Sequence, residues 1–205
     1  MTTDPRWKSQ LGQDRFVWET LDRKTGGTYF DIGAGHPERI SNTVVLERGF
    51  GWRGLLSDIE YDRQLREQRA KDNIYRADAT DIDYEAQWLR LASDEFRWVD
   101  FLSLDLEPPD LTARVLLRMP LDRIRFRIAC VEHDAYRDGE RGILRRDMMR
   151  SFMEWSGYVR VADIVVDMQI EDEIVQAHIE DWWVHSDAED LVERAQLVLT
   201  GGGAI

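Results

Sequence analysis

Short apolar runs alternate with charged segments of helical periodicity along most of the chain. The apolar runs have the length of buried strands and lie at 28–32, 52–57, 73–76, 98–104 and 124–131. The segments between them predict helices at 41–48, 61–71, 84–92 and 111–119. Strands that alternate with helices form a parallel sheet that is covered on both faces.

The ends of the chain depart from this alternation. A helix over 13–22 precedes the first strand, and the last part of the chain predicts a helix, two strands and a helix at 142–155, 158–166, 174–184 and 188–199. Because the two late strands have only a short connection, we expect an antiparallel hairpin at one edge. In the helix at 41–48, Ser41 or Asn42 is the expected cap and Glu47 belongs to the exposed side.

The predicted fold is therefore a single α/β domain over 1–205, Rossmann-like, with a mostly parallel seven-stranded sheet, an antiparallel edge hairpin and helices on both faces. Residues 1–27 are an N-terminal helical extension, and 200–205 form a flexible tail. The 205 residues suit one domain, and apolar clusters recur along a chain that is 43% hydrophobic and 33% charged. This composition excludes a disordered protein.

The net charge of −13 bears on the class of partner. A long polyanion is repelled by such a field, so we expect no general nucleic-acid binding, while a single nucleotide or a sugar stays possible. The lone cysteine, Cys130, lies in an apolar stretch and is expected to be a small buried hydrophobe. The polar N-terminus has no signal-peptide core, and no apolar run approaches the ~18 residues of a spanning helix. We expect a cytoplasmic protein without membrane contact.

An acidic residue follows each of the first five predicted strands: Asp31, Asp58, Asp78, Asp105 and Glu132. In an open parallel sheet the ligand lies outside the carboxyl ends of the strands, where these side chains converge. The pattern therefore predicts a ligand site at this edge, although each acid taken alone is typical of an ordinary turn.

The segment after the first strand contains Gly33 and Gly35, which let the backbone turn tightly and approach a ligand. Asp58 is placed to accept the ribose hydroxyls of an adenosine, and Asp78 with Ala79 to meet the adenine amino group. A dinucleotide fingerprint requires a third glycine, and this chain has Glu38 there, a carboxylate that would repel a pyrophosphate. The acidic pocket instead favours S-adenosylmethionine, with its sulfonium charge and no phosphate.

The expected reacting end contains Asp105, Glu107 and His133. His133 is the candidate general base, because imidazole titrates near neutral pH. The three side chains together could also hold a divalent cation such as Mg²⁺, which would lower the pKa of an acceptor hydroxyl. The alternative is that these acids serve only loop geometry and hydrogen bonding.

Several motifs together resemble those of the FkbM-type methyltransferases. They are SQLGQDRFV, GGTYFDIGAGHPERISNTVVLE, GWRGLLSDIE, DFLSLDLE, RFRIACVEHD and the closing EDWWVH. The resemblance covers Ser9 to about His185 and implies S-adenosylmethionine-dependent O-methylation of a small hydroxylated acceptor, such as a sugar or a natural-product scaffold. It implies a cofactor cradle at Asp31, Gly33 and Gly35, with Asp58 on the ribose and Asp78 near the adenine. It also implies that Asp105, Glu107 and His133 line the reacting end.

The chain departs from that family in two places. Pro108-Pro109-Asp110 stands where a glycine and a second acid usually follow, and the prolines stiffen the loop beside the expected acceptor site. At the ribose position the usual residue is glutamate, which is one methylene longer than Asp58. The first departure predicts a different acceptor, and the second leaves the cofactor unchanged.

Other interpretations stay open at this point. The altered proline loop is compatible with an inactive cofactor-binding scaffold or interaction protein, and the glycine turn with a nucleotide-dependent oxidoreductase. The aromatic residues of the run 181–185 either line an acceptor pocket or pack an edge strand. Four aromatic residues near the late strands either bind a sugar face or bury a homodimer seam: Trp155, Tyr158, Trp182 and Trp183.

Overall fold

The computed structural model describes residues 6–92, 98–170, 173–188 and 190–201. The strands are β1 (Thr28–Ile32), β2 (Arg53–Ser57), β3 (Ile74–Arg76), β4 (Val99–Leu104), β5 (Phe126–Glu132), β6 (Tyr158–Ile170) and β7 (Glu173–His185). They form one seven-stranded sheet in the order β3-β2-β1-β4-β5-β7-β6. Pairs among β1 to β5 are parallel, and β7 is antiparallel to β5 and β6. The predicted topology is confirmed.

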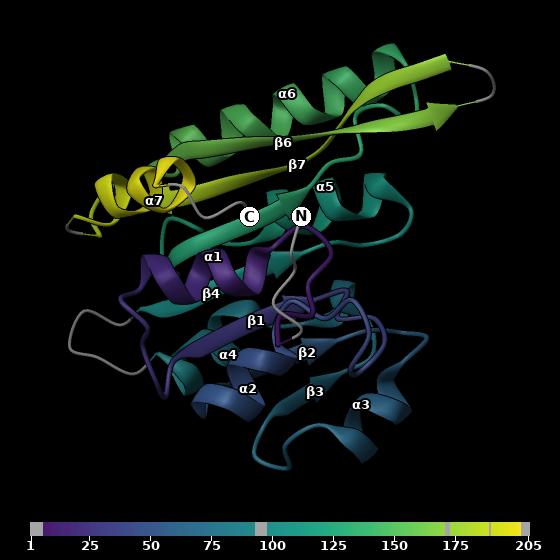
Figure 1. Cartoon of the computed structure of the whole chain (residues 1–205). Helices are drawn as coiled ribbons and strands as arrows, with labels where there is room; N and C mark the ends of the chain where they lie inside the picture. Colours follow the sequence, from purple (N-terminus) through teal and green to yellow (C-terminus); the bar gives the residue numbers. More distant parts are fainter. Residues whose placement is uncertain (1–5, 93–97, 171–172, 189, 202–205) are drawn as a thin grey trace.

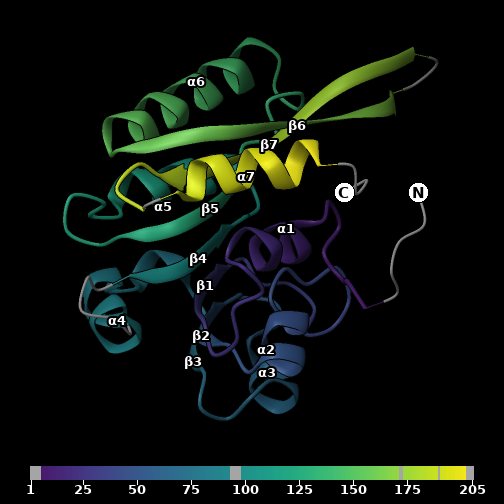
Figure 2. The same cartoon turned by 60° about the vertical axis from the view of Figure 1, so that its left-hand side comes forward.

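Helices cover both faces of this sheet (Figure 1). They are α1 (Gln13–Thr20), α2 (Val44–Phe50), α3 (Asp62–Gln68), the 3-10 turn η1 (Ala79–Asp81), α4 (Tyr84–Leu91), α5 (Pro109–Arg118), α6 (Glu140–Trp155) and α7 (Leu191–Thr200). The buried side chains form two cores, one on each face of the sheet. Figure 2 shows α1, α2, α3 and α7 over one face, while α4, α5 and α6 belong to the other core.

The edge hairpin is longer than predicted. β6 and β7 run for 13 residues each, and their distal part extends beyond the parallel strands (Figure 1). The ladder continues through polar pairs such as Asp167 with Gln176. Because a backbone ladder needs no apolar side chains, the apolar pattern underestimates the strand length.

Three smaller expectations can be compared with the structure. Cys130 is buried in β5, where burial raises the pKa of its thiol, and the prediction of a buried hydrophobe is confirmed. Within the described ranges, no helix has the length and apolarity that a membrane crossing requires. Of the predicted tail, Thr200 ends α7, and residues 202–205 lie outside the described part of the chain.

The expectation that Glu47 is exposed is wrong. Its side chain is 5% exposed and pairs with the fully buried guanidinium of Arg69, with 3.0 Å between Nη2 and Oε2. Glu47 also accepts hydrogen bonds from the Tyr29 hydroxyl and the Asn73 amide. Burial raises the pKa of Glu47, but Arg69 and these hydrogen bonds outweigh it and lower the pKa overall. The partner of Glu47 lies beyond the end of α3, and the pattern of α2 alone does not reveal it.

This pair generates the first prediction. Arg69→Met leaves the Glu47 carboxylate buried without its cation, which should lower the free energy of unfolding by about 3–5 kcal/mol. The measurement is urea denaturation at neutral pH. The matched control is Arg63→Met, which removes an exposed pair with Glu67 on α3 and should leave the stability unchanged. Equal effects of the two substitutions would contradict a structural role for the buried pair.

Candidate functional site

The turn after β1 brings two strand ends together. Gly33 has a φ of 84°, and a Cβ atom there would lie 1.5 Å from the carbonyl oxygen of Asp105. The Gly33 and Ala34 amides donate to the Ser57 carbonyl at 2.7 and 3.0 Å. Only glycine permits this approach, because any side chain would collide with the end of β4. Gly35 has a φ of 60°, and its missing Cβ would face open space.

A cavity of about 440 Å³ opens beside this turn, at the carboxyl ends of β1 and β4. It is lined by Asp31, Gly33, Ala34, Gly35, His36, Arg39, Ile40, Asn42, Tyr61 and Asp105. The structure therefore brings together four of the predicted site residues from two segments that are far apart in the sequence. Two of its lining groups are carboxylic acids, and Arg39 is its one arginine or lysine.

Asp31 is held firmly below the cavity. The side chain is buried, and its Oδ2 accepts a hydrogen bond from the Thr43 hydroxyl at 2.5 Å. Burial raises the pKa of Asp31, against the opposing effects of Thr43 and Arg69. Arg69 also donates to the Thr43 hydroxyl at 3.0 Å. The buried pair of Arg69 and Glu47 therefore orients Thr43, which in turn orients Asp31.

Asp58 organises the glycine turn and does not line the cavity. Its Oδ2 accepts from the Gly35 amide at 2.9 Å, and its Oδ1 accepts from the amides of Glu60 and Tyr61 at 2.9 and 2.8 Å. The carboxylate therefore ties the start of α3 to the turn. One lone pair of Oδ2 stays available for a ribose hydroxyl.

Asp78 and Ala79 lie at the end of β3, two strands away from β1. Asp78 caps the η1 turn by accepting hydrogen bonds from the amide and hydroxyl of Thr80, which lower its pKa. Ala79 is 5% exposed and belongs to the core. Neither residue lines the cavity, and their predicted adenine contacts stay a prediction.

Three carboxylic acids form a row on the face of the sheet that carries Asp31. Glu132 on β5 pairs in register with Glu180 on β7, and Asp105 follows β4 beside Glu132. Asp105 and Glu132 share a side-chain hydrogen bond. Burial, followed by the neighbouring acids, raises the pKa of Glu132 to about 10, and burial raises that of Asp105 to about 6. The carboxyl row (Asp105, Glu132, Glu180) begins at the cavity wall, and within it Glu132 and Glu180 retain protons at neutral pH, whereas Asp105 loses its proton near pH 6.

Glu180 was missed by the sequence interpretation. It is 3% exposed, and its Oε1 accepts from the Gln13 amide at 2.7 Å and from the Trp182 indole at 2.5 Å. Burial raises its pKa to about 8. The available signal was the alternation of side chains along the last strand, which places Glu180 on the same face as Trp182.

The predicted trio of Asp105, Glu107 and His133 does not assemble. Glu107 is exposed and pairs with Arg137 at 2.6 Å. His133 is 1% exposed, and its Nε2 faces Asp181 at 3.7 Å. Successive side chains of a strand point to opposite faces, so His133 leaves the face that carries Glu132. The trio therefore forms neither the predicted general-base site nor the predicted Mg²⁺ site in this arrangement.

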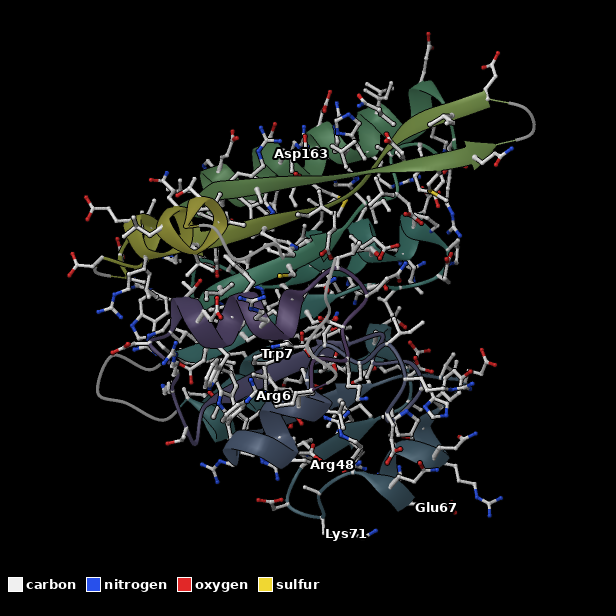
Figure 3. The ribbon with its side chains drawn as sticks, viewed as in Figure 1. Arg6, Trp7, Arg48, Glu67, Lys71 and Asp163 are labelled. Carbon is white, nitrogen blue, oxygen red and sulfur yellow. The ribbon has the colours of Figure 1, made fainter. Side chains whose placement is uncertain are left out.

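A different set of potential metal ligands does come together. Within the described ranges, His133, Asp163 and Asp181 place one ligand atom each within 4.8 Å of one another. Asp163 lies on β6, in the part of the molecule that carries α6 (Figure 3). The Arg150 guanidinium already pairs with Asp163 at 2.8 Å and with Asp181 at 2.7 Å. This arginine supplies the positive charge that the two carboxylates require.

The aromatic candidates near the late strands are mostly structural. Trp182, Trp183 and Tyr158 are buried in the two cores, where they pack the edge strands. Trp155, at the end of α6, is 78% exposed. Trp182 and Trp183 therefore serve packing, as one interpretation expected, but on β7, which lies between β5 and the edge strand β6.

Comparisons with known proteins identify the fold. No family model matches the sequence, and no curated protein matches it either. Aeropyrum pernix fibrillarin, solved with bound S-adenosyl-L-methionine, is 14% identical with a TM-score of 0.50, covering 87% of this chain and 76% of that one. A Streptococcus agalactiae protein of the NADB-Rossmann superfamily is also 14% identical, with a TM-score of 0.50 over 95% of this chain and 79% of that one.

A third structure, the O-methyltransferase from Bacillus cereus in complex with SAH, is 12% identical with a TM-score of 0.48, covering 87% of this chain and 83% of that one. At such identities the likeness concerns the fold alone. The chain has the Rossmann-like fold of class I methyltransferases, as predicted. The resemblance to the FkbM-type methyltransferases stays a prediction from the sequence.

Glu180 generates a prediction about stability. Its pKa of about 8 in the folded protein lies above the value of about 4.3 for an unfolded glutamate. The neutral Glu180 carboxyl therefore stabilises the folded protein fully below the pKa of the unfolded glutamate. This stabilisation is lost as the pH rises through the pKa of Glu180 in the folded protein. Glutamine stays neutral, so the free energy of unfolding of Glu180→Gln should increase relative to that of the wild type by about 1 kcal/mol per pH unit between about pH 5 and 8.

The measurement is urea denaturation across that pH range. Glu193→Gln, on the exposed side of α7, is the control and should follow the wild type. Parallel pH profiles for the wild type and Glu180→Gln would show that Glu180 is ionised in the folded protein.

Proposed function

We propose that this chain is an S-adenosylmethionine-dependent methyltransferase that methylates a hydroxyl group of a small molecule. The observation that carries the proposal is the cavity at the ends of β1 and β4, with Asp31 and Asp105 in its wall and the glycine turn beside it. In this fold the ligand site lies outside the carboxyl ends of the strands.

The residues of the cavity fit this cofactor and do not fit a dinucleotide. A pyrophosphate is usually bound by the start of a helix that follows the glycine turn directly. Here α2 begins only at Val44, and Glu38 lies in the intervening loop. The two carboxylic acids of the wall instead complement the sulfonium and amino charges of S-adenosylmethionine. Gly35 lines the cavity, and a Cβ atom there would meet no other protein atom. The absence of a side chain at Gly35 therefore leaves this space free for a ligand.

S-adenosylmethionine, when bound, supplies an electrophilic methyl group. The chain must position the acceptor and take the proton of its hydroxyl. Of the three predicted catalytic residues, Asp105 alone lines the cavity. Its hydrogen bond with Glu132 lets the two acids hold one proton between them, and a pKa of about 6 suits a proton acceptor near neutral pH. We therefore assign the general base to Asp105, with Glu132 as its positioning residue.

The charge around the cavity favours a small acceptor over a nucleic acid. The cavity wall contains the acids Asp31 and Asp105, and the chain carries a net charge of −13. Phosphate backbones are bound through several lysine or arginine contacts, whereas this wall offers only Arg39.

Cofactor binding is tested by calorimetric titration with S-adenosylhomocysteine, with and without Mg²⁺. We expect micromolar binding that Mg²⁺ does not change. Asp31→Asn keeps the oxygen that accepts from Thr43 but removes the charge, so it should weaken binding about tenfold. Asp62→Asn, which removes a half-buried carboxylate that pairs with Arg66 on α3, is the matched control.

The titration also separates the competing functions. No binding of S-adenosylhomocysteine would reject the proposal, and binding of a reduced nicotinamide cofactor instead would restore the oxidoreductase interpretation. Cofactor binding without methyl transfer to any member of a broad acceptor panel would favour the inactive scaffold. Transfer to RNA but to no small molecule would correct the acceptor class.

The general base is tested by the pH dependence of methyl transfer. In the wild type, kcat/KM should rise with pH through about 6, because Asp105 accepts a proton only when it is ionised. Asp105→Asn should lower kcat by about 100-fold or more and abolish this rise. His133→Gln should retain the rise with an unchanged midpoint. The reverse pattern would return the role of general base to His133.

A further inference from the structure

A second cavity lies at the opposite, amino-terminal edge of the sheet. Its volume is about 580 Å³, and its walls come from the segment after α1, from the beginnings of β4 and β5 with the residues just before them, and from the start of α7 with the residues just before it. Asp100 lies near the start of β4, whereas Asp105 follows its end, and five residues of extended strand span about 16 Å. The two cavities are therefore separate sites on opposite edges of one sheet.

The second cavity has the opposite charge to the first. Its wall contains four cationic side chains, Lys24, Arg125, Arg127 and Arg194, and only two carboxylates, Asp100 and Asp187. A local excess of positive charge is notable in a chain whose net charge is −13. Cations gathered in one cavity repel each other, so an arrangement of this kind favours the binding of an anion.

Asp100 holds part of this cluster in place. It is 0% exposed, and its Oδ1 contacts Lys24 Nζ at 2.7 Å and Arg127 Nη1 at 3.0 Å. Its Oδ2 accepts a hydrogen bond from the Thr28 amide at 2.9 Å. One buried carboxylate thus fixes two cations at the cavity wall.

The other two cations, Arg125 and Arg194, are positioned by an aromatic ring and by a helix, and Arg127 contacts the same ring. The guanidinium groups of Arg125 and Arg127 lie 5.8 and 5.4 Å from the centre of the Trp98 ring. Arg125 also pairs with Asp187, an exposed contact that contributes little. Arg194 is exposed on the first turns of α7, and no ion pair to it is found among the described residues.

The start of α7 closes one side of the cavity through Leu191, whose amide donates to the Ala188 carbonyl at 3.2 Å. The helix contributes to the charge of the cavity through the Arg194 side chain, and the cationic side chains alone favour an anionic ligand.

We propose that this second cavity binds a small phosphate-bearing molecule. Guanidinium and ammonium groups suit the several oxygens of a phosphate. The ligand is small because the rest of this acidic surface repels an extended polyanion. The site does not depend on the proposed methyl transfer, and it is too distant from the first cavity to hold the methyl acceptor.

The test is calorimetric titration of the full chain with pyrophosphate at low ionic strength. Binding should be measurable and should raise the melting temperature of the protein. Arg194→Glu should weaken it about tenfold or more, because it reverses an exposed charge at the cavity wall. Arg63→Glu, on α3, changes the net charge equally and should leave pyrophosphate affinity unchanged. Both variants should keep the wild-type affinity for S-adenosylhomocysteine.

Three results would overturn the inference. The first is no pyrophosphate binding by the wild type at millimolar concentration. The second is equal weakening by Arg194→Glu and Arg63→Glu, which would indicate non-specific attraction. The third is displacement of pyrophosphate by a single-stranded RNA that binds more tightly, which would assign the cavity to a nucleic acid. None of these results affects the S-adenosylhomocysteine titration, so failure here is distinguishable from failure of the proposed function.

Discussion

The buried pair of Arg69 and Glu47 joins four parts of the chain beneath the first cavity. Arg69 follows α3, Glu47 lies on α2, and their shared hydrogen bonds reach Tyr29 on β1 and Thr43 before α2. Burying two charges is costly, and this cost is offset only when the remaining donors and acceptors are also satisfied. Here they are, because Arg69 further donates to the Pro37 carbonyl. The loop that borders the cavity is therefore fixed from below.

The carboxyl row extends this constraint across the sheet. Register places Glu132 beside Glu180, and the strand period keeps both on the face that carries Asp31. Three neighbouring acids with raised pKa values oppose folding at high pH, since each must lose a proton while buried. A packing role alone would be met at lower cost by apolar residues. Such clusters are typical of sites where protons are exchanged.

Local patterns predicted the strands, their mostly parallel arrangement and the convergence of the strand ends that carry Asp31 and Asp105. These features depend on periodicity and on the rule that parallel strands end at one edge. The sequence did not predict Glu47 as buried, because its partner Arg69 lies in a different segment, just after the end of α3. It also misplaced His133, whose position one residue after Glu132 sends it to the opposite face of the sheet. Pairings between distant elements depend on register and packing, which a single sequence does not encode locally.

The two ends of β4 lie in surroundings of opposite charge. Asp100 at one end gathers cations, whereas Asp105 at the other lies among acids. The difference arises from the surroundings, because Asp100 pairs with the cations Lys24 and Arg127, whereas burial among other acids raises the pKa of Asp105. A net charge of −13 hides this separation. The overall charge therefore describes the average field, while the sheet directs cationic and anionic ligands to different edges.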